Sequence, residues 1–101
     1  MAYSHVLLRS AQVEYAEIVR YLFEALKSPG AASSFADEFD RQIELVCVNP
    51  FIHALSRMPE LAVREYRAFF VNNYLVLYRI EGDLVVVAHI FHQTQNYAKL
   101  V

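Results

Sequence analysis

The feature that most constrains the fold of this chain is a change in the spacing of its apolar residues near residue 63. Before that point they recur at three- and four-residue intervals, as on one face of a helix. After it they alternate with polar residues or run together in short stretches rich in Val, Tyr, Phe and Leu, as in β-strands. Helices and most strands are therefore kept apart along the chain, which is typical of α+β domains.

A short strand and an amphipathic helix are predicted at the start of the chain. Residues 3–9 are apolar and partly β-branched, which indicates the strand. The helix is expected over residues 11–27, with Ser10 as its N-cap and Glu14 in its first turn. Its apolar side would pack against the rest of the domain.

A second amphipathic helix is predicted between two prolines. Ser28-Pro29 suits its start, because proline at the first helical position gives up no useful N–H, and Asn49-Pro50 suits its end. The residues expected on its buried face are Ala32, Phe35, Ala36, Phe39, Ile43, Val46 and Cys47. Cys47 is therefore interpreted as a core residue, with a reactive thiol as the less favoured alternative.

Three more strands are predicted after an irregular segment. Residues 51–62 contain Pro59 and have no regular period, so we expect a loop there with at most one helical turn. The stretches "VREYRAFF", "NYLVLYRI" and "DLVVVAHIF" have the composition of strands. They are separated at hairpin distance by "NN" and "EGD", which favours antiparallel pairing.

The order of these elements predicts a single domain over residues 1–101. It would be of the α+β class, β-α-α-β-β-β, with two N-terminal helices packed on one face of an antiparallel sheet. Within the stretch "NYLVLYRI", one face would carry Tyr74, Val76 and Tyr78 and the other Leu75, Leu77 and Arg79. Alternation alone does not say which of these faces meets the helices. We expect the face away from the helices to be partly open to a partner.

Composition indicates a reducing compartment and no membrane partner. The chain has one cysteine, so no disulfide can form within it. No 15-residue apolar run follows a basic N-terminus and no 18-residue apolar run occurs, so we expect neither a signal peptide nor a membrane span. We therefore expect a cytoplasmic protein. Hydrophobic content is 56%, high for so small a domain, which indicates that some apolar surface is reserved for a partner.

The charge of the chain argues against direct nucleic-acid binding. Nine basic and eleven acidic residues give a net charge of −2. Residues 1–50 hold four basic and seven acidic groups, a balance of −3, and residues 51–101 hold five basic and four acidic groups, a balance of +1. A protein that binds phosphates usually carries a strong basic excess, which this chain lacks.

Three stretches, in this order, resemble toxins of the RelE/ParE superfamily, which belong to bacterial type II toxin–antitoxin (plasmid stabilisation) systems. "LLRSAQVEYAEIVRYL" is similar to the family's first strand and helix, and "YRAFFVNNYLVLYRI" to its pattern of Tyr-Arg, a turn and a strand. "HIFHQTQN" is similar to the family's polar ending, and His92-Gln93 with Asn96 bring it nearer the ParE branch. The resemblance covers nearly the whole chain.

The resemblance implies a toxin that is neutralised by a cognate antitoxin, of a kind that is usually partly disordered and folds on binding. Toxins of the ParE branch are thought to poison DNA gyrase, so a gyrase inhibitor that needs no cofactor is expected. The alternatives are a ribosome-dependent messenger-RNA endoribonuclease like RelE, or a family member without toxicity, and a homodimer is also open. The chain departs from the nuclease pattern because the turn before Tyr74 has no basic residue, and it carries His89 where arginine is common in the family.

The polar stretch that ends the last strand is interpreted as a contact surface. Its side chains offer hydrogen-bond donors and acceptors without fixed charge, as a recognition surface does. The residues expected to contact a target or partner are Arg67, His89, His92, Gln93, Gln95 and Asn96. His89 and His92 are three apart on a strand and point to opposite faces, so no metal site is predicted.

A nuclease would need other groups in place. RNA cleavage without a metal requires a base, an acid, and cations that hold the phosphate. The candidates for these roles are Arg67, Tyr78, Arg79 and His92. The simpler interpretation of two of them is structural: Tyr78 would pack in the core, and Arg79 would pair with an acidic residue.

Overall fold

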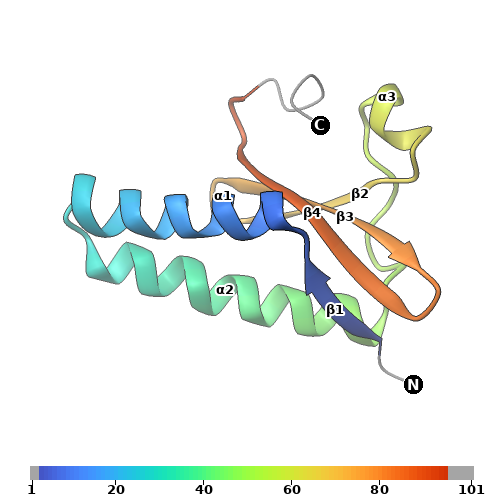
Figure 1. The fold of residues 1–101 in the computed structure, drawn as a ribbon, viewed down its shortest axis with the longest axis horizontal. Coiled ribbons are helices and arrows are strands. Elements are labelled where there is room, and N and C mark those ends of the chain that lie inside the picture. The colour runs from blue at the N-terminus through green and yellow to red at the C-terminus, as the bar shows by residue number, and fades with distance from the viewer. Residues whose placement is uncertain (1–2, 96–101) are drawn as a thin grey trace.

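The predicted helices and strands form in the computed structural model, which describes residues 3–95. In chain order the elements are β1 (Ser4–Leu7), α1 (Arg9–Arg20), the π-helical turn η1 (Tyr21–Ala25), α2 (Pro29–Val48), α3 (Pro59–Ala62), β2 (Arg67–Val71), β3 (Tyr74–Glu81) and β4 (Leu84–His92). Figure 1 shows α1 and α2 as an antiparallel pair to one side of a twisted sheet, with α3 apart from them. The predicted α+β class and the order of its elements are confirmed.

The four strands form one sheet in the order β1-β4-β3-β2. The last three are joined by tight turns and pair antiparallel, as predicted. β1 differs, because it lies parallel to β4, from Ser4 beside Leu84 to Leu7 beside Val87. A tight turn forces two strands to run antiparallel, but a long connection through helices allows either direction. The helical hairpin that follows β1 is such a connection.

A β-bulge in β4 changes which side chains face the helices. The pairing register shifts between Leu77 and Tyr78 of β3, and this leaves Ala88 of β4 as the extra residue. As a result, Val87 and Ile90 both pack in the core beneath the helices although they are three residues apart. The bulge therefore sets the direction in which the polar end of β4 points.

α1 differs from its prediction at both ends. It begins at Arg9, and Ser10 is not its cap, because the Ser10 hydroxyl donates a 2.6 Å hydrogen bond to the carbonyl of Ala88 in β4. Glu14 consequently lies in the second turn. The helix widens into η1 near its end, and Lys27, with a φ of 50°, turns the chain toward α2. The predicted cap is wrong because the hydroxyl satisfies a strand carbonyl that has no neighbouring strand.

The ends of α2 agree with their prediction, and five of the seven residues predicted for its buried face are buried. Ser28 caps it by accepting a 3.1 Å hydrogen bond from the N–H of Ala31, Pro29 is its first residue, and Asn49 ends it. Its buried residues are Ala32, Phe35, Phe39, Ile43 and Val46, whereas Ala36 and Cys47 are half-buried. Neither α2 nor any other helix within residues 3–95 is long and apolar enough to cross a membrane.

Buried apolar side chains lie on both faces of the sheet. The alternation predicted for β3 is confirmed, and Tyr74, Val76 and Tyr78 are the side chains that meet the helices. On the other face, a second cluster consists of Leu61, Tyr66, Leu75, Leu77, Ala88 and Phe91, with Met58 and Ala68 packed against it. The face that was predicted to be partly open is thus partly covered by the segment that contains α3.

The segment before β2 is a turn, although a strand was predicted from residue 63. Glu65 has a φ of 64°, a left-handed conformation that no strand contains. The N–H of Tyr66 then bonds to the carbonyl of Leu61 at 3.0 Å and closes the end of α3. The strand begins only at Arg67 because this helical ending takes up the residues before it.

Candidate functional site

Tyr78, a candidate acid for RNA cleavage, is a core residue. Its side chain is fully buried, and its hydroxyl donates a 2.7 Å hydrogen bond to the carbonyl of Pro50. Burial raises the pKa of Tyr78 to about 12, so the phenol stays neutral and continues to donate this bond. The interpretation that Tyr78 packs in the core is confirmed.

Arg67, a candidate for both catalysis and contact, holds the same connection between α2 and the sheet. Its Nη1 donates a 2.7 Å hydrogen bond to the carbonyl of His53, and its guanidinium carbon lies 5.0 Å from the centroid of the Phe51 ring. The His53 ring in turn stacks on Phe69 with centroids 5.4 Å apart, and burial lowers the pKa of His53. Arg67 therefore fastens the loop after α2 to β2.

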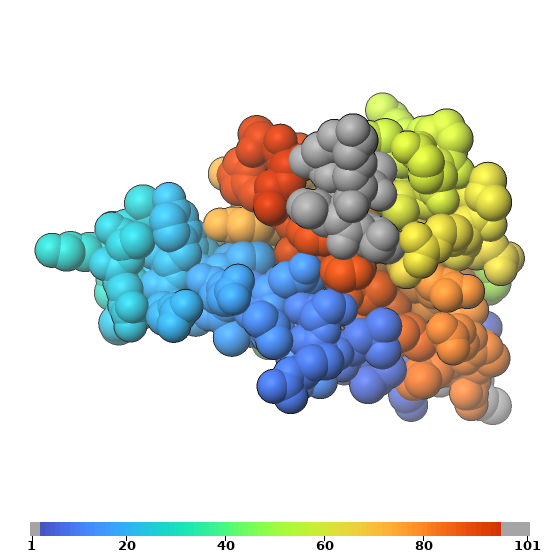
Figure 2. All heavy atoms as spheres, turned by 45° about the horizontal axis from the view of Figure 1, so that its top comes forward, coloured from blue at the N-terminus to red at the C-terminus, as the bar shows by residue number. Residues whose placement is uncertain are grey.

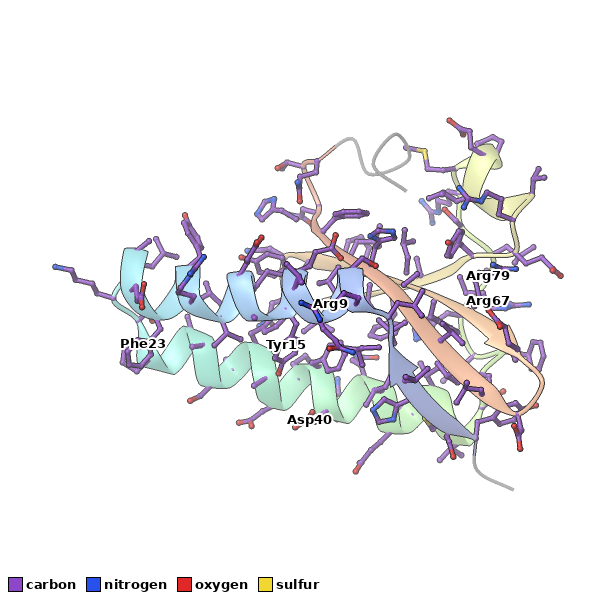
Figure 3. The ribbon with its side chains drawn as sticks, viewed as in Figure 1. Arg9, Tyr15, Phe23, Asp40, Arg67 and Arg79 are labelled. Atoms are coloured by element: carbon purple, nitrogen blue, oxygen red, sulfur yellow. The ribbon has the colours of Figure 1, made fainter. Side chains whose placement is uncertain are left out.

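Arg67 pairs with Tyr78 and shares its face of the sheet, so Arg79, the next residue of β3, lies on the opposite face, although Figure 3 shows the two arginines at the same end of the sheet. The guanidinium carbon of Arg79 lies 5.6 Å from the centroid of the Tyr66 ring, and that of Arg64 lies 5.4 Å from the same ring. Among residues 3–95, neither Arg64 nor Arg79 has a carboxylate within 4.0 Å of its guanidinium group. The prediction that Arg79 pairs with an acid is therefore wrong, because an aromatic ring takes the place of the carboxylate.

His89 pairs with a carboxylate that the sequence did not indicate. Its Nδ1 lies 3.1 Å from Oε2 of Glu14, and Oε1 of Glu14 accepts a 2.8 Å hydrogen bond from the N–H of Ile90. β1 ends at Leu7, so the outer edge of β4 beyond that point has no strand beside it, and Glu14 and Ser10 of α1 cover it instead. Glu14 and His89 are 75 residues apart in the sequence, and no local sequence pattern predicts a contact at that separation.

The polar end of β4 folds back on itself beside the β2–β3 turn. The N–H of His92 donates a 2.7 Å hydrogen bond to Oε1 of Gln95, and the N–H of Gln93 donates one of 2.9 Å to the carbonyl of Asn73. The predicted contact residues that gather here are His92, Gln93 and Gln95, while Asn96 lies outside the described residues. We call residues 92–95 the β4 terminus.

The predicted contact residues do not form one surface. His92 pairs with Tyr74, whereas Arg67 pairs with Tyr78, four residues farther along β3. At roughly 3.3 Å per residue, this offset alone separates them by about 13 Å. His89 contacts α1, while the His92 ring stands edge-on to Tyr74 with centroids 5.4 Å apart. In the part of the chain that the structure describes, no three His, Cys, Asp or Glu side chains gather where they could hold a metal ion.

A groove of about 700 Å³ opens between the helices and the ends of the strands. Its lining includes Ile18, Tyr21, Leu22 and Leu26 on the helical side and Tyr74, His92 and Gln95 on the strand side. Tyr21 and Leu26 are 52% and 53% exposed, and Glu14 and Glu17 add acidic groups to the lining. Figure 2 looks onto this part of the molecule, where the red end of β4 stands beside pale blue and teal helical residues. The groove thus combines exposed apolar side chains with an acidic side.

The sequence of the whole domain fits one family. Residues 6–97 match the family model described as the ParE toxin of the type II toxin–antitoxin system, parDE. The chain belongs to the ParE toxin family. This confirms the resemblance and the branch to which it was assigned. No curated protein matches the chain in sequence.

Solved structures share the ParE fold at low sequence identity. A chain of the chromosomal ParDE TA system from P. aeruginosa has a TM-score of 0.69 and 16% identity, over 90% of this chain and 96% of that one. A chain of the toxin–antitoxin complex RelBE2 from Mycobacterium tuberculosis has a TM-score of 0.50 and 14% identity, over 91% of this chain and 99% of that one. Both neighbours support the arrangement of helices on a four-stranded sheet.

Proposed function

We propose that this ParE-family toxin inhibits DNA gyrase by binding to it and is neutralised by a cognate antitoxin. The observation that carries the proposal is the position of the nuclease candidates. The hydroxyl of Tyr78 and Nη1 of Arg67 bond to the carbonyls of Pro50 and His53. Arg79 lies over Tyr66 on the opposite face of the sheet, and His92 lies at the other end of β3. A metal-independent ribonuclease needs such groups around one phosphate, and these do not converge.

The surface features favour a protein target over a nucleic acid. The net charge of −2 gives no general attraction to phosphates. The β4 terminus instead offers uncharged hydrogen-bonding side chains next to exposed apolar ones, of which Tyr21 and Leu26 line the same groove as His92 and Gln95. Such a mixture is typical of surfaces that recognise proteins. The proposed gyrase contacts are therefore centred on His92, Gln93 and Gln95.

The groove also suits the antitoxin. An amphipathic segment that folds on binding would place its apolar face on Ile18, Tyr21 and Leu26, in the manner of a helix docked in a groove. The two solved neighbours come from toxin–antitoxin systems, which supports a partner of this kind. Because His92 and Gln95 belong to the groove lining, a segment bound there would cover part of the proposed target surface. Neutralisation would then be direct obstruction of the target contact.

Expression of the chain alone tests the proposed target. We expect filamentation and DNA damage in the cells while translation continues, and we expect His92→Ala with Gln95→Ala to reduce both effects. Messenger-RNA cleavage that is lost in His92→Ala would establish the ribonuclease alternative. Normal growth with folded protein present would establish a member without toxicity. Rescue by the product of the adjacent reading frame tests the antitoxin.

Two matched substitutions test the groove. Leu26→Glu places a charge in the groove, whereas Phe23→Glu places the same charge on a side chain of nearly equal exposure, 53% against 55%, that does not line it. Leu26→Glu is expected to abolish co-purification with the product of the adjacent reading frame, and Phe23→Glu to leave it unchanged. Equal effects of the two substitutions would contradict the assignment of the groove.

A further inference from the structure

We propose that Arg64, Tyr66 and Arg79 form a second binding site, which takes a carboxylate side chain from an acidic segment of a partner protein. The site lies on the face of the sheet away from α1 and α2, so it is separate from the groove. Tyr66 is 6% exposed and anchored in the second apolar cluster, whereas Arg64 is exposed and Arg79 half-buried. A fixed ring thus positions two accessible cations.

The geometry leaves both guanidinium groups ready to bind an anion. The guanidinium carbon of each lies over the Tyr66 ring, 5.4 Å from its centroid for Arg64 and 5.6 Å for Arg79, so both arginines make a cation–π contact with this ring. Within residues 3–95, the side chain of neither Arg64 nor Arg79 donates a hydrogen bond or has a carboxylate within 4.0 Å. An arginine has five side-chain N–H donors in a planar fork that matches a carboxylate, and no group of residues 3–95 accepts a hydrogen bond from the guanidinium of Arg64 or Arg79.

The surrounding charge favours a single carboxylate over a polyanion. The described residues from 51 to 95 carry four arginines and four acidic residues, which sum to zero. The acidic residues among them are Glu60, Glu65, Glu81 and Asp83. A nucleic acid binds through the summed field of many cations, and residues 51–95 supply no net positive charge for this. The arginine pair can therefore recognise only a local charge, at short range.

The neighbouring side chains favour a peptide over a free anion. Val63 is 82% exposed next to Arg64 in sequence, and Phe70, which is 55% exposed, lies about 13 Å along β2 from Tyr66, within the length of a short peptide. By alternation in β2, Phe70 shares its face with Ala68, which packs against the same cluster as Tyr66. A small ion gains nothing from these apolar groups, whereas a segment with an acidic residue between apolar ones contacts both.

The test is a titration of the full chain with a blocked synthetic hexapeptide that contains Asp and Glu between leucines. The readout is the Nε–Hε resonances of the arginines. We expect those of Arg64 and Arg79 to shift together, and we expect Arg64→Gln with Arg79→Gln to weaken binding by about tenfold or more, as loss of a charge-assisted hydrogen bond does. The control is Arg9→Gln with Arg20→Gln, which removes the same charge from exposed positions on α1 and is expected to leave binding unchanged.

Lysine variants and titrations with other anions distinguish a carboxylate peptide from a nucleic acid or a free phosphate. Lysine at both positions keeps the charge but removes the planar fork, and it is expected to bind more weakly than the wild type. Tighter binding of a short DNA duplex or of inorganic phosphate than of the peptide would overturn the proposal. So would the absence of resonance shifts, or an equal loss in the control variant. None of these readouts uses toxicity, so their failure is distinct from failure of the gyrase proposal.

Discussion

The two ends of β3 differ in what their polar neighbours do. At the Tyr78 end, a buried hydroxyl and the guanidinium of Arg67 bond to carbonyls of the loop after α2. At the Tyr74 end, His92 and Gln95 bond to each other and line an open groove. The first end is therefore closed by its own chain, and the second is available to another molecule. Tyr, Arg and His side chains must therefore be judged by what their polar atoms contact, because the same residue types stabilise the fold at one end and lie at the surface at the other.

The largest effect is expected at the closed end. Tyr78→Phe keeps the ring but leaves the Pro50 carbonyl without its donor, so the free energy of unfolding should fall by about 2 kcal/mol, as for other buried hydrogen bonds. Urea unfolding measures this, and Tyr21→Phe, on a ring that is 52% exposed, serves as the control. A loss no larger than that of Tyr21→Phe would show that the closed end is not held by this bond. Toxicity per folded molecule should not change.

Glu14 connects the open end to the fold, and its removal should be the next largest effect. Glu14→Ala leaves the N–H of Ile90 without an acceptor and His89 without its partner, at a cost of about 1.5 kcal/mol. Glu14→Gln keeps an oxygen that can accept from Ile90, so its loss should be smaller. Amide hydrogen exchange at Ile90 distinguishes the two variants. Equal protection in Glu14→Ala and the wild type would contradict the role given to this carboxylate.

The local signals in the sequence were sufficient for much of the fold. Ser28-Pro29 and Asn49-Pro50 mark the ends of α2, and the two-residue spacing of apolar groups gives β3 its correct faces. Each of these features is decided by neighbours within a few residues. The branch of the family also followed from the residues themselves, since the stretches compared are contiguous.

The contacts that define the sites could not be predicted in the same way. Ser10 looked like a cap, but its hydroxyl bonds to Ala88, and Glu14 looked like a first-turn residue, but it pairs with His89. In both cases the partner is more than 70 residues away, and the choice depends on β1 being too short to cover β4. Arg79 contacts the ring of Tyr66 and not the acidic residue that was expected beside it. The sequence could not indicate this contact either, because it depends on how the segment with α3 packs on the sheet.

A substitution in the turn after α3 is expected to increase the stability of the protein. Glu65 holds a φ of 64° at the end of α3, a conformation that glycine adopts without the penalty of a side chain. Glu65→Gly should therefore raise the free energy of unfolding by about 1 kcal/mol. Glu60→Gly, within α3, should instead lower it, because glycine is a poor helix former. A loss in both variants would show that the turn is not strained.

The smallest effect should be a pH dependence at the closed end. Burial lowers the pKa of His53 below the value of about 6.5 that it has in the unfolded chain, so the unfolded state binds a proton more readily. The free energy of unfolding should then be highest above that value and fall as the pH drops below it. His53→Gln should flatten this dependence between pH 7 and pH 5, measured by urea unfolding. A His53→Gln profile parallel to that of the wild type would contradict the assignment.

The cover that α1 places over β4 has a consequence for the toxin as a free molecule. An uncovered strand edge is a template on which other chains can add, and this is how folded proteins begin to form fibrils. Beyond the end of β1, the carbonyl of Ala88 and the N–H groups of Ile90 and His92 are occupied by side chains of Ser10, Glu14 and Gln95. A second molecule therefore finds these groups already bonded. Because these side chains occupy the edge of β4 that the short β1 leaves uncovered, we expect this edge not to pair with a second molecule when no partner is bound.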